Sequence, residues 1–248
     1  MKRTLQSLAI ALGLSFVSIA PAQADATGDA ALAKVDEATN RAKTQYLEYE
    51  ATVKAAEKAD RKVELAVWLK GDKRLSEFLG PADVKGTKVL ILSPTQMYVY
   101  LPAFGKVRRI ASHTTDQGFM GMHFSQDELS ITRYAALYEA TIAKQDDKTI
   151  DLVLTAKKDA KPPYPKIELK VEKARNLPVE MRYFGESGKL LKTETRGAYT
   201  CEKDVCAPSE LSMTEHGKAG AKTLLNRRKW KVNEALSDDL FSKRNLEK

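Results

Sequence analysis

The sequence is poor in the residues that most often perform catalysis or bind metals. Its 248 residues include three histidines and two cysteines. The patterns GxSxG and HExxH, the P-loop and the glycine-rich dinucleotide loop are all absent. His113 and His123 lack further ligands for a zinc site, and all three histidines are expected in loops or on the surface. We therefore predict no metal, no cofactor and no catalytic residue, and rank an enzyme of envelope lipids below a binding protein.

Long hydrophobic runs are also scarce. The apolar run at residues 8–20 is too short to span a membrane comfortably. It follows a basic start and precedes the small residues AQA, which is the pattern of a secretory signal peptide. We predict a signal peptide at residues 1–24, cleavage after Ala24, and a mature domain of residues 25–248 in the periplasm. No cysteine lies near the predicted cut, so the pattern does not indicate a lipid anchor.

The two cysteines do not form the CxxC spacing of redox motifs. Cys201 and Cys206 are separated by four residues in CEKDVC, and an exported protein matures in an oxidising compartment. No histidine lies near enough to suggest a metal site. We predict a structural disulfide that closes a short loop and contributes about 2 kcal/mol in the chain-entropy model.

Charge of one sign does not dominate. The chain has 41 Lys and Arg against 33 Asp and Glu, a formal net charge of +8. The positive residues are dispersed and mostly alternate with apolar ones. They fit either solvated strand faces or attraction to anionic lipid headgroups. No nucleic-acid motif is visible, so we expect no nucleic-acid partner.

Hydrophobic periodicity predicts a mainly β (α+β) fold. Apolar residues recur at helical spacing over 27–43, and Ser125 with Glu128 forms a capping-box signature for a short helix within 125–138. Alternating apolar residues predict strands near 63–69, 89–92, 97–101, 140–143, 150–155, 167–171, 179–184, 190–199, 211–214 and 223–232. The regular turns and the lack of long helices between strands favour one antiparallel meander.

Several strands carry large apolar side chains on both faces. In YVYL, Tyr98 and Tyr100 share one face and Val99 lies on the other. A sheet with one solvated face needs apolar residues on only one side, so both faces should be covered. We expect the helix at 27–43 to cover one face, and a ligand or the loop at 117–124 to cover the other.

That loop, QGFMGMHF, is unusually apolar. Burying each of its four large apolar side chains stabilises the fold by roughly 1.5–3 kcal/mol, so the loop should dock against an apolar surface. Gly118 and Gly121 allow it to bend. Two interpretations stay open: a mobile lid that shifts when an acyl chain enters, and a fixed plug of the core.

Several segments resemble a known family. PADVKG, MYVYLPAFGKVRRI and GFMGMHFSQDEL, within residues 80–129, are similar to exported bacterial outer-membrane lipoprotein-sorting proteins, relatives of the LolA and LolB carriers. NLPVEMRYFGESGKLLKT (176–193) and DDLFSKRNLEK (238–248) are similar too. The resemblance implies a single open antiparallel half-barrel of about 11–13 strands, with an N-terminal and a mid-chain helix plugging its concave face. In the family, the apolar cavity between them holds lipid acyl chains.

The resemblance also implies a function. We expect a monomeric periplasmic carrier that moves lipid or lipoprotein acyl chains toward the outer membrane, working with an inner-membrane exporter and an outer-membrane acceptor. The candidate ligand-binding residues are Val67, Leu69, Phe78, Leu90, Leu92, Tyr98, Tyr100, Phe119, Met120, Met122 and Phe124. Their faces depend on register, since a shift of one residue reverses every side chain. The candidate headgroup contacts at the cavity mouth are Lys106, Arg108 and Arg109.

The alternative is a lipid-sensing regulatory module of the same fold that contacts a membrane signalling protein. A second domain that docks the partner would favour it, and no part of residues 140–248 reads as one. We therefore place this alternative below the carrier.

Overall fold

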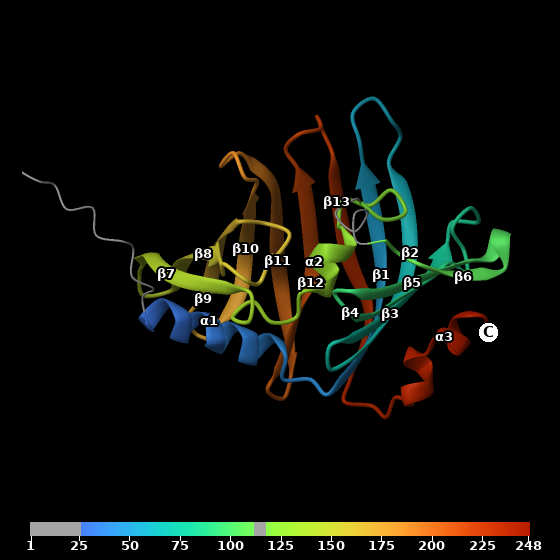
Figure 1. Ribbon diagram of the computed structural model, residues 1–248, viewed down its shortest axis with the longest axis horizontal. Coiled ribbons are helices and arrows are strands. Elements are labelled where there is room, and N and C mark those ends of the chain that lie inside the picture. Colours follow the sequence, from blue (N-terminus) through green and yellow to red (C-terminus); the bar gives the residue numbers. More distant parts are fainter. Residues whose placement is uncertain (1–25, 112–117) are drawn as a thin grey trace, which may run out of the picture.

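The computed structural model describes residues 26–111 and 118–248 (Figure 1). The predicted signal peptide, its cleavage site and His113 lie outside these residues. The helical elements are α1 (Ala26–Thr39), η1 (Pro102–Phe104), α2 (Gln126–Ser130), η3 (Asp238–Phe241) and α3 (Lys243–Leu246). No helix among the described residues is both long and apolar enough to cross a membrane.

Thirteen antiparallel strands form one sheet in the described part of the chain. The strands are β1 (Thr44–Lys54), β2 (Arg61–Lys70), β3 (Lys73–Gly80), β4 (Lys88–Ser93), β5 (Gln96–Leu101), β6 (Lys106–Arg109), β7 (Tyr138–Gln145), β8 (Thr149–Ala156), β9 (Lys166–Glu172), β10 (Leu177–Phe184), β11 (Leu190–Glu202), β12 (Val205–Glu215) and β13 (Lys222–Val232). The sheet does not close, and helices cover it, so the predicted open half-barrel is confirmed.

The order of the strands places the first and the last strand, β1 and β13, side by side in the middle of the sheet. It runs β6-β5-β4-β3-β2-β1-β13-β12-β11-β10-β9-β8-β7. The two edge strands, β6 and β7, are therefore consecutive in the chain, and residues 110–137 connect opposite edges of the sheet. In Figure 1, α2 lies across the sheet on the same side as α1. We call the face that these two helices cover the inner face, and the opposite one the outer face.

Helix α1 is fixed by two carboxylates to β7 and to residues 118–137, which we call the crossing segment. The amide of Ala140 donates to Asp29 Oδ1 at 2.7 Å. The amides of Tyr134 and Ala135 donate to the two oxygens of Asp36 at 2.9 and 2.8 Å. These bonds use backbone donors that the sheet leaves unpaired, so they anchor the helix where burial alone would not fix its position.

Both predicted helices are shorter than expected. The helix predicted at 27–43 ends at Thr39, because the Asn40 side chain donates to the carbonyls of Asp36 (2.7 Å) and Thr132 (2.8 Å) and the chain then extends into β1. The helix predicted within 125–138 covers only Gln126–Ser130. Its capping box is present, but Ile131 is already extended.

Strand β1 was not predicted from the sequence. Its inward residues Leu47, Ala51 and Val53 are buried and do alternate, but Tyr46 and Tyr49 place aromatic rings on opposite faces and blur the pattern. The strand pairs with β2 and with β13, so it joins the two halves of the sheet.

Both faces of the sheet carry apolar residues, as predicted. The segment that covers the outer face differs from the prediction. The outer cluster consists of Leu75, Leu90, Phe241 and Leu246, with Trp68, Leu92, Tyr98, Tyr100, Val107, Leu236 and Leu240 packed against it. Phe241 and Leu246 belong to the C-terminal η3 and α3, and the Lys243 ammonium lies 4.4 Å from the centre of the Tyr98 ring. The C-terminal segment therefore covers this face, where a ligand or the loop was expected.

The predicted disulfide is confirmed. Cys201 of β11 and Cys206 of β12 are directly opposed, and their sulfurs are bonded. The bond closes the end of the hairpin that these two long strands form.

The contact between α1 and β7 should not tolerate a larger residue at position 28. An alanine Cβ there would lie 2.3 Å from the carbonyl oxygen of Ala140. We expect Gly28→Ala to lower the free energy of unfolding by about 1–3 kcal/mol, measured by urea denaturation. Gly197→Ala, in β11, is the control, since no atom lies within 4 Å of its added Cβ. Equal losses in both variants would contradict this account.

Candidate functional site

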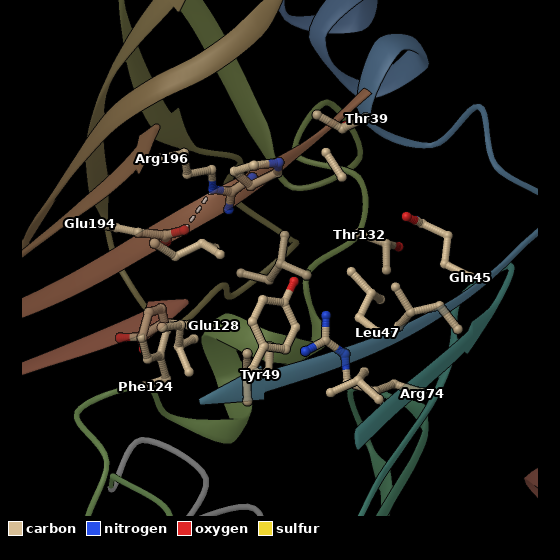
Figure 2. A pocket seen from close by; sticks show the side chains of 18 of the residues that line it. Thr39, Gln45, Leu47, Tyr49, Arg74, Phe124, Glu128, Thr132, Glu194 and Arg196 are labelled. Carbon is tan, nitrogen blue, oxygen red and sulfur yellow. Dashed lines mark hydrogen bonds and ion pairs between the residues drawn. The ribbon is translucent and has the colours of Figure 1, made fainter. Parts of the chain in front are cut away.

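A cavity of about 260 Å³ lies between the inner face, the end of α1 and the crossing segment (Figure 2). Its sheet wall is mainly apolar and comes from both halves of the sheet. Representative wall residues are Leu47, Leu65, Val67, Leu69, Phe78, Val89, Leu169, Met181, Leu211 and Leu225. The opposite wall comes from Val35 of α1 and from Phe119, Met122, Phe124, Leu129 and Ile131.

Six of the eleven predicted ligand-binding residues line this cavity: Val67, Leu69, Phe78, Phe119, Met122 and Phe124. Met120 does not line it. The Met120 side chain packs against the inner core, and its carbonyl accepts a hydrogen bond from Arg61 Nη1 at 2.8 Å. As ligand-binding residues all of them stay predictions.

The other four predicted residues do not line the cavity. Leu90, Leu92, Tyr98 and Tyr100 lie in the outer cluster, beneath the C-terminal segment. The reason is that successive side chains of a strand point to opposite faces of the sheet. On β4, Val89 lines the cavity, so the next residue, Leu90, points to the outer face.

The predicted headgroup residues are also placed elsewhere. Lys106, Arg108 and Arg109 belong to the edge strand β6, are exposed, and do not line the cavity. Arg109 donates to the carbonyl of Thr95 at 2.7 Å, and the Arg108 guanidinium lies 5.1 Å from the centre of the Phe104 ring. Their expected position at the cavity mouth is therefore corrected.

The apolar loop is docked by its backbone as well as by its side chains. Gly118 pairs with Ser125, and the amide of Met122 donates to the carbonyl of Phe119 at 3.0 Å. An added Cβ at Gly118 would lie 2.2 Å from the carbonyl oxygen of Met122, so this tight turn requires glycine there. The Phe119 ring lies 5.7 Å from the Phe78 ring, centre to centre, and closes one end of the cavity.

A buried ion pair fixes α2 to the sheet. Glu128 of α2 and Lys192 of β11 lie 2.7 Å apart, and their side chains are 2% and 10% exposed. The Tyr164 hydroxyl donates to the same Glu128 oxygen, while the other oxygen accepts from the amide of Ser125 at 2.8 Å. Lys192 also donates to the carbonyl of His123 at 3.1 Å. Both charges are therefore paired within the protein.

A second buried carboxylate lies in the cavity wall on β11. Glu194 accepts hydrogen bonds from Arg196 Nε and from the Tyr183 hydroxyl, both at 2.6 Å (Figure 2). Burial, and then the adjacent Glu194 carboxylate, raise the pKa of Tyr183 well above its usual value. Glu194 thus has a donor on each of its oxygens.

Arg74 of β3 has no such partner. No hydrogen bond or ion pair joins its guanidinium to any other described residue, although Figure 2 shows it pointing into the cavity toward Tyr49. Burial is the main cause that lowers the pKa of Arg74, Tyr49 and Glu194 act to raise it, and the nearby charge of Arg196 lowers it further. Arg74, Glu194 and Arg196 were not predicted from the sequence. The available signal was a charged residue at the inward position of an alternating strand, as in RLSEF.

His123 is buried in the loop, where a surface or loop position was expected. Its ring Nδ1 and its backbone amide both lie 2.9 Å from Thr223 Oγ1 of β13. Burial lowers the pKa of His123, Lys218 and Lys192 act in the same direction, and Glu215 opposes them. No group of three or more potential metal-ligating side chains occurs in the part of the chain that the structure describes.

Comparison with known proteins places this geometry in a group of similar folds. A family model with the description "Uncharacterized protein" matches residues 70–248. A solved domain from Vibrio parahaemolyticus, described as an outer membrane lipoprotein-sorting protein domain, is 25% identical, with a TM-score of 0.78 over 90% of this chain and 99% of that one. No curated protein sequence matches this chain.

Two further structures share the fold at lower identity. A DUF1329 family protein from Desulfovibrio piger has a TM-score of 0.82 at 21% identity, covering 89% of this chain and 98% of that one. A LolA superfamily protein from Nitrosomonas europaea has a TM-score of 0.72 at 19% identity, covering 88% and 98%. The resemblance found in the sequence is confirmed by these neighbours.

Removing one partner of the buried ion pair should destabilise the protein more than removing both. Glu128→Gln leaves the Lys192 ammonium without a carboxylate, and we expect a loss of about 3–5 kcal/mol in the free energy of unfolding. The double variant Glu128→Gln/Lys192→Met should lose less, because no buried charge is left unpaired. Urea denaturation at pH 7 measures both. Glu37→Gln, in an exposed pair with Arg41, is the control and should change little. A double variant that is less stable than Glu128→Gln would contradict the pairing.

Burial of His123 should make the protein less stable in mild acid. The pKa of His123 is lowered in the folded state, so below about pH 6.5 the unfolded chain binds more protons at this residue. Its contribution to stability is therefore present near pH 7 and is lost as the pH falls. We expect His123→Gln to reduce the dependence of the unfolding free energy on pH between 7 and 5. His216→Gln, at an exposed residue, is the control. Unchanged pH dependence in His123→Gln would show that the ring titrates equally in both states.

Proposed function

The chain belongs to the family whose model matches residues 70–248, and from this membership and the LolA-type fold we propose that it is a periplasmic carrier of acyl chains. In this proposal, residues 25–248 act as one lipid-binding domain after cleavage of the signal peptide. The cargo is a lipid or the acyl chains of a lipoprotein, taken from an inner-membrane exporter and delivered to an outer-membrane acceptor. The chain carries its cargo as a monomer without chemical conversion.

The observation that carries the proposal is the cavity on the inner face. Its walls come from nine of the strands, from α1 and from the crossing segment, and most of them are aliphatic or aromatic. At about 260 Å³ it is close to the lower end of the range for small-molecule sites, about 300–1,000 Å³. Such a site binds hydrocarbon because burial removes apolar surface from water.

The docked loop supplies a way for the cavity to adapt. Phe119, Met122 and Phe124 form part of its wall, and methionine accommodates irregular apolar guests. Movement of this short loop would enlarge the cavity without breaking the sheet. In the proposal the loop therefore acts as a lid that shifts when the cargo enters.

Filling the cavity should abolish binding of apolar ligands while leaving the fold intact. Leu69 of β2 is half-buried in the cavity wall, so Leu69→Trp places an indole in the space that the ligand needs. We expect its affinity for N-phenyl-1-naphthylamine, an uncharged fluorophore whose emission rises in apolar surroundings, to fall at least tenfold. Fluorescence titration measures this affinity.

The matched control is Leu79→Trp on the neighbouring strand β3. Leu79 is 39% exposed and does not line the cavity, so the same substitution should leave binding unchanged. Equal binding by Leu69→Trp and the unmodified protein would contradict a ligand site in this cavity. Failure of the unmodified protein to bind any apolar probe would contradict the carrier itself.

A further inference from the structure

The cavity has two chemically different ends. Two of its lining residues are exposed. Lys43 lies just before β1 begins, and Gly71 lies in the turn between β2 and β3. The polar lining residues Thr39, Gln45 and Thr132 gather near this end (Figure 2). The other end is formed by Phe78 and the docked loop. Solvent therefore reaches the cavity at a polar end, and the interior becomes apolar away from it.

Arg74 lies next to the polar end. It pairs in register with Leu69 on β2, beside the turn that contains Gly71. Phe78, on the same face of β3, is four residues further along, a distance of about 13 Å at the rise of a strand. A cationic group and an aromatic wall thus stand in line along one strand, at a separation that a medium-length alkyl chain can span.

The carboxylates of the cavity make their direct bonds with residues other than Arg74. Glu194 has one oxygen bonded to Arg196 and the other to Tyr183, and Glu128 is paired with Lys192. Glu194 acts on Arg74 through space, but no described residue forms a direct ion pair with its guanidinium. The Arg74 side chain is only partly buried, so water reaches its guanidinium, and an anion that enters the cavity can take the place of this water.

We propose that the cavity binds an amphiphile with a single anionic headgroup, and that Arg74 is the residue that binds this headgroup. The inference rests on the carrier function proposed above and names the class of its ligand. The planar guanidinium offers two parallel N–H groups to a carboxylate or to a phosphate oxygen pair. Tyr49, whose hydroxyl points into the cavity near Arg74, supplies a further donor. The alkyl chain then runs along β3 toward Phe78 and Phe119.

This assignment replaces the headgroup contact expected at β6. Lys106, Arg108 and Arg109 lie at the edge of the sheet and outside the cavity, whereas Arg74 lies inside it. A bound headgroup gives the Arg74 guanidinium the direct ion pair that no described residue forms with it.

The test compares ligands that share a tail and differ in the headgroup. Dodecanoate, dodecyl phosphate and 1-dodecanol are each titrated against the protein by displacement of N-phenyl-1-naphthylamine. We expect at least one of the two anions to bind at least tenfold more tightly than the alcohol, and the comparison between them identifies carboxylate or phosphate as the headgroup. In Arg74→Met the anion should lose this advantage while the affinity for 1-dodecanol stays the same. Arg74→Lys should recover part of it.

Control variants and outcomes separate this inference from the carrier proposal. Arg108→Met removes an exposed guanidinium of β6 and should bind all three ligands as the unmodified protein does. Equal affinity of the unmodified protein for the alcohol and both anions would overturn the headgroup assignment and leave the apolar site standing. Parallel losses of alcohol and anion binding in Arg74→Met would also overturn it. A protein that binds neither the fluorophore nor any tail would overturn the carrier proposal instead.

Discussion

The arrangement of the molecule follows from the crossing segment, residues 118–137, which lies over the inner face. The two edge strands, β6 and β7, are consecutive in the chain, so the segment between them has to pass from one edge to the other. It cannot pass through the sheet, and it carries buried apolar residues that need a surface to pack on. The inner face is consequently covered by its own connection, with α1 beside it.

Polar bonds hold this cover in place. The loop and α2 are held by directional bonds: Glu128 to Lys192, His123 to Thr223, and Arg61 to the carbonyl of Met120. Such bonds fix the segment at particular points over the sheet. The result is a sheet with a covered inner face, a residual cavity, and a gradient from a polar end to an aromatic one.

Much of the fold could be predicted from the sequence because its signals are local. Strand alternation, the capping box of Ser125 and Glu128, and the spacing of Cys201 and Cys206 each act over a few residues, and all three appear in the structure. The lengths of the helices could not be predicted, because α1 is ended by a contact between Asn40 and Thr132, which are distant in sequence. The faces of β4 and β5 were assigned wrongly. Both faces of these strands are apolar, so the alternation of residues does not indicate which side chains point to the inner face. Arg74 was missed for a related reason: its unpaired state depends on which carboxylates the fold gives to other residues.

The proposed carrier function requires that hydrocarbon occupies the inner face of the sheet. The most direct measurement is a titration of protein with ¹³C-labelled Leu and Val methyl groups against a dodecyl ligand, followed by NMR, with intermolecular contacts recorded. We expect shifts and contacts at Val67, Leu69 and Leu211, and none at Leu90 and Leu92 under the C-terminal segment. Contacts confined to the outer face, or shifts spread evenly over both faces, would contradict it.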